Sequence, residues 1–134
     1  MLNYKEVNVN FKNKITTDCV VRAIATATGK DYKEVARELF ENYMKTGYAM
    51  NDKKNYEKYL EQLGWFKIRQ PRKSNNTKYL IGEANHYATI KKNRVVIMRC
   101  AHHLTCKVDN ELIDIWDCRY KTIGNYWIKG EYYE

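Results

Sequence analysis

The stretch that decides the fold is TTDCVVRAIATATG, residues 16–29. Thr16 or Thr17 can cap the start of a helix here, and Gly29 can end it in the left-handed conformation. A helix that is apolar on all sides is a buried one. The apolar side chains that surround this helical axis are Val20, Val21, Ala23, Ile24, Ala25 and Ala27. We therefore predict a central, buried helix with Cys19 at its N-terminus.

The rest of the chain predicts two more helices, followed by strands. The helices are expected over residues 31–45 and from residue 51 or 52 to Gly64. Residues 77–90 are ambiguous and can be read at helical spacing. Because helices come first and antiparallel strands second, we predict an α+β fold with the N-terminal helices packed on a C-terminal antiparallel sheet. The strands are expected at residues 65–68, 94–100, 103–108, 111–116 and 125–130.

Length and composition exclude several classes of protein. The 134 residues fit one domain, with 44% hydrophobic and 30% charged residues, which is typical of a soluble globular chain and not of a disordered one. No apolar stretch reaches the roughly 18–20 residues that span a bilayer, and the N-terminus has no apolar signal-peptide region. We therefore expect a cytoplasmic protein without a membrane partner. Its four cysteines are then expected as reduced thiols.

The formal net charge of +8 has two interpretations. Basic residues cluster at positions 67–73 and 91–94. These clusters are either ordinary solvated surface or a surface that attracts an acidic partner. Since no nucleic-acid-binding motif accompanies the charge, we do not expect nucleic acid as the partner.

A hairpin with Asp109 and Asn110 at its tip would determine which residues of its two strands face one another. Both residue types tolerate positive φ, and this tip pairs residues whose numbers sum to 219. Because side chains alternate along a strand, one face of the hairpin then carries His103, Asp114 and Trp116. His103 and Asp114 become diagonal neighbours that can hydrogen-bond, and the Trp116 indole beside them would exclude water.

These residues suggest a nucleophilic site. A thiol at a helix N-terminus has a lowered pKa, because unpaired N–H groups and the helix dipole favour the thiolate. A carboxylate beside a histidine fixes its tautomer and favours its protonated form. Cys19, His103 and Asp114 could thus supply a nucleophile, a base and an orienting group. The alternative is a small buried cysteine and a solvated His–Asp pair.

At these positions the sequence resembles the papain-like cysteine peptidase superfamily. The shared pattern is a Cys at the start of a central helix, a His that opens a strand, and an Asp on the next strand with a Trp two residues later. The segments DCVVRA (18–23) and HHLTCKVDNELIDIWDC (102–118) carry the similarity, which is strongest to small papain-like proteins of phages and low-GC bacteria. One departure is His102, where those proteins have Gly. His102 could compete with His103 as the base.

The resemblance implies a papain-like domain over residues 1–134 and a thiol hydrolase, either a cysteine peptidase or an isopeptidase, that acts on peptides or proteins. It implies Cys19 as nucleophile, His103 as base and Asp114 as orienting group, without an external cofactor. Asn13, six residues before the Cys, takes the place of the oxyanion-hole amide. The same triad also serves acyl transferases and deamidases. A further alternative is a papain-like scaffold that binds a phage or host partner with little turnover.

A zinc site is a rival interpretation of Cys100, His102, His103 and Cys106. On one continuous strand Cys100 and Cys106 would lie about 20 Å apart, far beyond the reach of one metal ion. A sharp turn at 101–102 would shorten that distance. We therefore predict no metal, with Cys106 as a small core residue.

Overall fold

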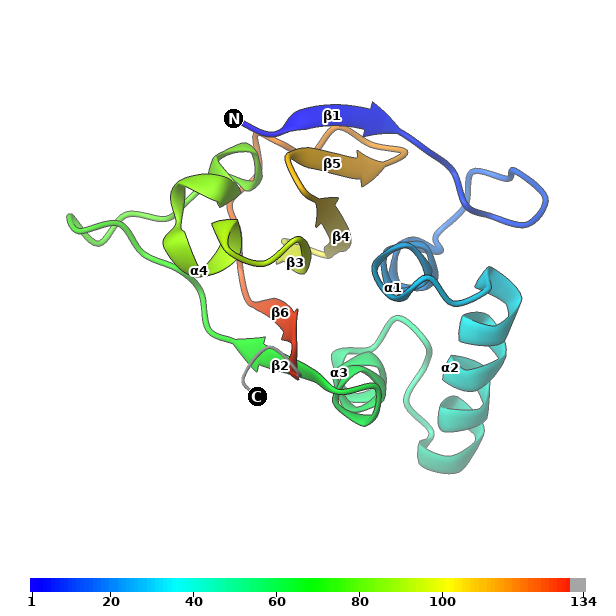
Figure 1. The fold of residues 1–134 in the computed structure, drawn as a ribbon. Helices are drawn as coiled ribbons and strands as arrows, with labels where there is room; N and C mark the ends of the chain where they lie inside the picture. The colour runs from blue at the N-terminus through cyan, green and yellow to red at the C-terminus, as the bar shows by residue number, and fades with distance from the viewer. Residues whose placement is uncertain (131–134) are drawn as a thin grey trace.

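The core of the fold is a six-stranded mixed sheet that helices cover on both faces (Figure 1). The computed structural model describes residues 1–130. The strands are β1 (Asn3–Glu6), β2 (Trp65–Ile68), β3 (Val95–Cys100), β4 (His103–Val108), β5 (Glu111–Asp114) and β6 (Tyr126–Lys129). The helices are α1 (Cys19–Thr28), α2 (Tyr32–Thr46), α3 (Lys53–Gln62), the 3-10 helix η1 (Ile81–His86) and α4 (Ala88–Lys91). In space the strand order is β1-β5-β4-β3-β6-β2.

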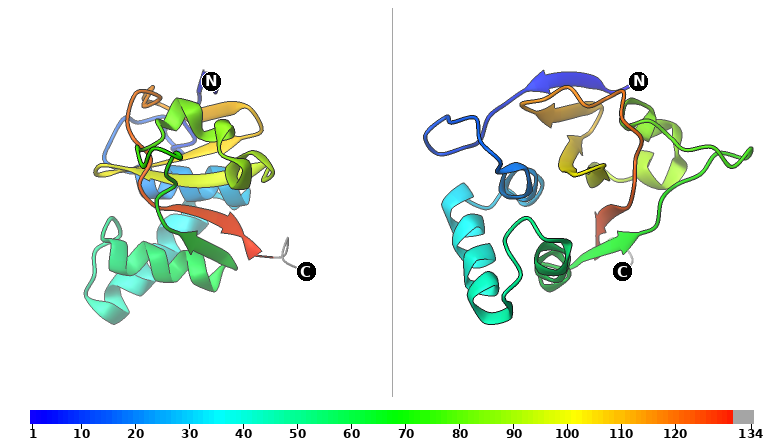
Figure 2. Two further views of the ribbon diagram at one scale, coloured as in Figure 1. Left: turned by 90° about the vertical axis from the view of Figure 1, so that its left-hand side faces the viewer. Right: turned by 180° about the vertical axis from the view of Figure 1, so that it is seen from behind.

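The sheet separates two hydrophobic cores. Helices α1, α2 and α3 lie on one side, and η1 with α4 lies on the other, as both side and rear views show (Figure 2). Successive residues of β3 alternate between the cores: Ile97 packs with the α1–α3 side, whereas Val96 and Met98 pack with the other side. A strand buried on both faces is expected to be largely apolar, as β3 is except for Arg99.

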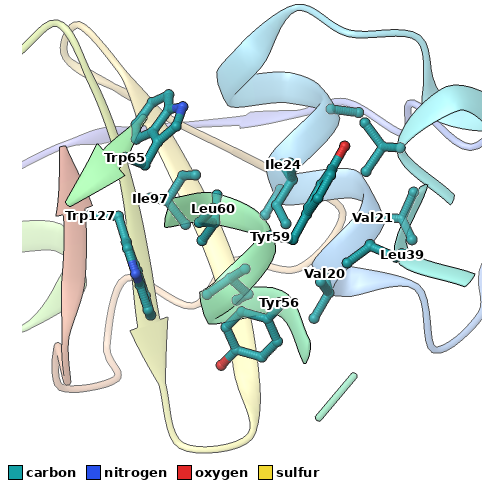
Figure 3. Packing of buried hydrophobic residues seen from close by; sticks show 14 residues of the cluster. Val20, Val21, Ile24, Leu39, Tyr56, Tyr59, Leu60, Trp65, Ile97 and Trp127 are labelled. Carbon is teal, nitrogen blue, oxygen red and sulfur yellow. The ribbon is translucent and has the colours of Figure 1, made fainter. Parts of the chain in front are cut away.

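Helix α1 is the central element of the first core. Val20, Val21 and Ile24 pack among Leu39 of α2 and Leu60 of α3, together with residues of the sheet (Figure 3). The helix ends at Gly29, whose φ of 74° is left-handed. The predicted buried helix is thus confirmed, and its N-cap is Asp18 instead of Thr16 or Thr17.

The predicted α+β architecture is confirmed, but the sheet is not purely antiparallel. β1 pairs with β5 in parallel, from Asn3 opposite Glu111 to Glu6 opposite Asp114. The sequence analysis missed β1 because NYKE is polar and largely exposed, so it lacks the apolar alternation that marks a half-buried strand. Its partner strand, and not its own composition, makes this segment extended.

The predicted hairpin register is confirmed. Val108 faces Glu111 and Cys106 faces Ile113, so the pairs sum to 219 as expected. Asp109 at the tip has a φ of 55°. Within the ambiguous residues 77–90, the helical parts are η1 and the start of α4, which the extended Tyr87 separates. Among residues 1–130, no helix has both the length and the apolar character needed to cross a membrane.

Candidate active site

A cleft of about 410 Å³ opens at the N-terminus of α1. It lies between the start of α1, the segment that leads into α3, and the turn between β3 and β4. The lining residues are Thr16, Thr17, Cys19, Val20, Arg22, Asn51, Lys53, Tyr56, Arg99, His102, His103 and Leu104. Cys19, the first residue of α1, is half-buried at this cleft. The volume is within the range of small-molecule and peptide-side-chain sites.

The structure brings the three residues predicted as a triad together. Cys19 and His103 line the same cleft, and the interaction between the thiol and the imidazole acts to lower the pKa of Cys19 and to raise that of His103. On its other side, Nε2 of His103 lies 2.7 Å from Oδ2 of Asp114. Since Nε2 is held by the carboxylate, Nδ1 is the ring nitrogen left for the thiol. The order thiol, imidazole, carboxylate is the arrangement that nucleophilic catalysis requires.

Asp114 is buried and fully engaged. Besides His103, it accepts hydrogen bonds from the Thr105 hydroxyl at 2.6 Å and from the Arg22 guanidinium at 3.0 Å, and from the backbone N–H of Ile115 at 2.7 Å. Burial alone would raise the pKa of this carboxyl, but the hydrogen bonds from His103 and Thr105 outweigh it and lower the pKa. These contacts therefore favour the ionised form of Asp114.

The surroundings of the Cys19–His103 pair shift both groups toward their charged forms, the thiolate and the imidazolium. Burial alone would lower the pKa of His103, but its hydrogen bonds to Asp114 and to neighbouring thiols raise that pKa to about 11. Burial alone would raise the pKa of Cys19. The hydrogen bonds from His103 and from the Leu104 backbone N–H, with the charges of His103 and Arg22, outweigh burial and lower the pKa. A lowered thiol pKa is what makes a cysteine nucleophilic near neutral pH.

The N-cap of α1 does not cap its own helix. The Asp18 side chain makes no hydrogen bond to the backbone of the first turn. Its carboxylate instead accepts from Arg22 at 2.7 Å, from Tyr32 at 2.7 Å and from Asn10 at 2.9 Å. The first N–H groups of α1, beginning at Cys19, therefore have no capping carboxylate. They remain available to a negative charge at the cleft.

Arg22 connects the two buried carboxylates of the site. Its Nε lies 2.7 Å from Asp18 and its Nη1 lies 3.0 Å from Asp114, and all three side chains are less than a tenth exposed. The sequence pattern did not single out Arg22, because apolar residues dominate the helix around it. The available signal was an arginine inside an otherwise apolar helix, since a buried guanidinium requires a carboxylate partner.

Trp116 and His102 both lie near His103, but they differ in their contacts. Trp116 packs edge-on against the His103 ring, with 4.8 Å between ring centroids and 78° between planes, as a shielding residue would. His102 lines the cleft but is exposed. The hydrogen bond to Asp114 belongs to His103, and it is the interaction with His103 that lowers the pKa of Cys19, so the structure distinguishes the two neighbouring histidines.

The structure does not bring Asn13 to the cleft. Asn13 is exposed, has a φ of 56°, and lies in a loop that closes on Asn10: Oδ1 of Asn10 accepts from the N–H groups of Lys12 and Lys14. Asn13 is not among the residues that line the cleft. The side-chain amide that does line the cleft is that of Asn51, which donates to the Thr17 carbonyl at 3.1 Å.

The remaining cysteines differ from Cys19. Cys100, Cys106 and Cys118 are fully buried, and all four cysteines are free. Burial raises the pKa of Cys106 to about 12. The pKa of Cys118 is also raised, by its hydrogen bond with Cys100 and by burial. The pKa of Cys100 is lowered by its hydrogen bond with Cys118, but all three side chains are fully buried and so are shielded from reagents in solution.

The residues that come closest to a metal-ligand set are not those of the predicted rival site. A sharp turn does exist at 101–102, but the grouped ligand atoms belong to His103, Asp114 and Cys118, within 4.8 Å of one another. Asp114 already forms an ion pair with the Arg22 guanidinium, and the thiol of Cys118 has a raised pKa. To bind a metal ion through these residues, the carboxylate would have to be free of its cation and the thiol would have to be ionised, so this donor set does not fit one.

No family model, curated protein or solved structure matches this chain.

Proposed function

We propose that this protein is a thiol hydrolase, a cysteine peptidase or isopeptidase, with Cys19 as nucleophile, His103 as general base and acid, and Asp114 as orienting group. The observation that carries the proposal is the 2.7 Å hydrogen bond between His103 and Asp114, with His103 and Cys19 lining the same cleft. A thiol placed in one cleft with a histidine–carboxylate pair favours an active enzyme over a binding module.

The proposed reaction proceeds through a thioester. The Cys19 thiolate attacks the carbonyl carbon of an amide, and the His103 imidazolium gives its proton to the leaving amine as the C–N bond breaks. Neutral His103 then takes a proton from water, whose oxygen attacks the thioester. The C–S bond breaks, the acid leaves, and the thiolate–imidazolium pair is restored. An amine that replaces water at this step would make the same site an acyl transferase.

The oxyanion of each tetrahedral intermediate lies, in this proposal, at the uncapped start of α1. The backbone N–H of Cys19 is one donor, and the Asn51 side chain is the cleft-lining amide that can supply a second. Asn51 thereby takes the role that the family resemblance assigned to Asn13. Removing one such donor typically slows turnover by about 10²–10³-fold.

The papain-like relationship is part of the proposal. It is supported by a nucleophile at the start of a buried helix, by that helix packing against β4, and by His103 and Asp114 on adjacent antiparallel strands. Trp116 against the His103 ring agrees with the same pattern. Fold resemblance alone does not choose a substrate, so the reaction must be tested directly.

The test is selective alkylation of the intact protein with iodoacetamide near neutral pH, with each cysteine quantified by mass spectrometry. We expect Cys19 to react at least about tenfold faster than a small free thiol, and the three buried cysteines to remain unlabelled. His103→Ala should slow the alkylation of Cys19 by about 10²-fold, because the thiolate loses its imidazolium partner.

A second measurement addresses turnover. Wild type and Cys19→Ala are compared on peptide, isopeptide and side-chain amide substrates, with and without an added amine nucleophile. Products that form only with Cys19 present support the proposal, and the product with added amine separates hydrolysis from acyl transfer. Uniform labelling of all four cysteines in folded protein would contradict the thiolate assignment.

A further inference from the structure

The cleft beside Cys19 is positively charged. Its twelve lining residues contain no carboxylate, but five basic side chains. Two of these, Arg22 and His103, are paired with Asp114. Arg99, Lys53 and His102 form no ion pair with a carboxylate of residues 1–130. A half-enclosed cleft lined by charge of one sign concentrates ligands of the opposite sign.

Arg99 is the distinctive member of this group. It is half-buried, whereas Lys53 and His102 are exposed. Arginine is enriched at sites that bind carboxylates, because its planar guanidinium can donate two parallel hydrogen bonds. A half-buried guanidinium without a carboxylate partner is costly unless a ligand supplies the missing charge.

The backbone of Arg99 is held in place on both sides. Its N–H donates to the Asn125 carbonyl at 3.0 Å, and its own carbonyl accepts from Gly124 at 2.6 Å. Arg99 lies opposite Leu104 in the β3–β4 ladder, on the sheet face toward α1 and α3. There it lines the cleft together with Tyr56, a buried residue of α3. A side chain on a fixed strand limits the freedom that a bound ligand must remove.

We propose that the cleft is an anion-selective substrate site, in which Arg99 binds a carboxylate of the peptide or protein substrate and Lys53 adds to its attraction. This inference rests on the proposed function, since Cys19 must be the nucleophile for the cleft to receive the substrate. The carboxylate is either an acidic side chain near the cleaved bond or the terminal α-carboxylate of the substrate. Both present the same planar group to Arg99.

The test compares two reagents that share one reactive carbon and differ in charge, iodoacetate and iodoacetamide. For each variant, the rate of iodoacetate at Cys19 is divided by the rate of iodoacetamide at Cys19. This ratio is then divided by the same ratio for a small free thiol. We expect this normalised ratio to fall about tenfold in Arg99→Gln and about two- to threefold in Lys53→Gln. Arg99→Lys should keep most of the preference, and added salt should weaken it in wild type.

Arg94→Gln is the matched control. Arg94 is an exposed arginine that lies just before β3, outside the cleft, and forms an ion pair with Asp109. Replacing it by Gln changes the net charge by the same amount as Arg99→Gln. We expect no change in the ratio. If Arg99 only neutralised the thiolate, Arg99→Gln would slow both reagents equally and leave the ratio unchanged. That result would overturn the anion site while leaving the proposed function intact.

Failure of the proposed function has a different signature. If iodoacetamide, the neutral reagent, alkylates Cys19 no faster than a small free thiol, Cys19 is not an activated nucleophile, and both inferences fall. Fast alkylation by iodoacetamide with a ratio insensitive to Arg99 removes only the anion site.

The source of the carboxylate is distinguished by protection of Cys19 against iodoacetamide. Three N-acetylated peptides are compared: one with internal Glu and an amidated C-terminus, its Gln counterpart, and the Gln peptide with a free C-terminal carboxylate. Stronger protection by the first peptide assigns an acidic side chain, and stronger protection by the third assigns a terminal carboxylate. Either advantage should disappear in Arg99→Gln. Equal protection by all three would overturn the proposal.

Discussion

The N-terminus of α1 differs from those of α2 and α3 in what its capping residue binds. Each of the three helices has Asp at its N-cap. In α2, Asp31 accepts from the N–H of Lys33, and in α3, Asp52 accepts from the N–H of Lys54. These are ordinary caps. In α1, Asp18 turns its carboxylate to Arg22, Tyr32 and Asn10 instead.

The difference shows how the N-terminus of a helix can be left open toward a cleft. Capped N–H groups are satisfied by the protein itself, so the starts of α2 and α3 stabilise their helices. At α1 the backbone donors stay open toward the cleft, and the carboxylate that could have capped them forms a buried ion pair. The same ion pair reaches Asp114 through Arg22, so the cap residue supports the orienting group of the candidate triad.

The largest expected effect comes from removing the cation that joins Asp18 to Asp114. Arg22→Met should lower the free energy of unfolding by about 3–5 kcal/mol, because it leaves two buried carboxylates without their shared partner. Chemical denaturation at pH 7 measures this value. The control is Arg37→Met on α2, where the ion pair with Glu41 is more than half exposed and its loss should cost less than about 1 kcal/mol. Similar losses in the two variants would show that Arg22 is not a structural link.

The next effect concerns the pH dependence of Cys19 alkylation. In wild type, the midpoint should lie below the ordinary thiol pKa, because the His103 imidazolium favours the thiolate. Asp114 is what keeps His103 protonated. In Asp114→Asn, His103 loses its proton at lower pH, the thiol holds its own proton more tightly, and the midpoint should rise. His103→Ala should raise it further. A midpoint unchanged in both variants would contradict the ion pair.

Acid should affect the buried carboxylates in a defined direction. The pKa values of Asp18 and Asp114 are lowered in the folded protein, so the unfolded chain takes up protons first as the pH falls. Their stabilisation is therefore complete above about pH 4 and is lost progressively below it. Denaturation at pH 7 and pH 3 should show a smaller loss for Asp114→Asn than for wild type. An equal loss would mean that Asp114 makes no contribution to acid sensitivity.

Substituting the three N-cap residues tests directly whether α1 differs from α2 and α3. Asp31→Ala and Asp52→Ala should each cost about 1 kcal/mol of stability and leave the alkylation rate of Cys19 unchanged. Asp18→Ala should also slow alkylation, since it disturbs the position of Arg22. If all three variants affect stability alone, the start of α1 has no special role.

The smallest effect is expected at Trp116. Trp116→Ala removes the edge-on contact with His103, and an aromatic contact of this kind contributes about 0.5–1.5 kcal/mol. We expect alkylation of Cys19 at pH 7 to change by about two- to tenfold. Trp116→Phe should retain most of the wild-type rate, because it keeps an aromatic ring against the imidazole. An effect as large as that of His103→Ala would mean that Trp116 has a role beyond shielding.

Local pattern alone was sufficient for the main elements and for part of the site. Apolar residues around one helical axis indicated that α1 is buried, and two-residue periodicity with the tip at Asp109 and Asn110 gave the hairpin register. That register places His103 and Asp114 on one face, where they lie in contact. Such features depend on neighbours in the sequence, and φ preferences and side-chain periodicity encode them directly.

Long-range contacts decided the rest. The parallel pairing of β1 with β5 joins segments about a hundred residues apart, and nothing in NYKE signals it. Asn13 is six residues before Cys19, but the Asn10 loop directs it away from the cleft, and Asn51 from the segment before α3 lines the cleft instead. Asp18, Arg22 and Asp114 become one buried network only when α1 packs on the sheet. Charges acquire their partners and pKa values through that burial, which no local pattern contains.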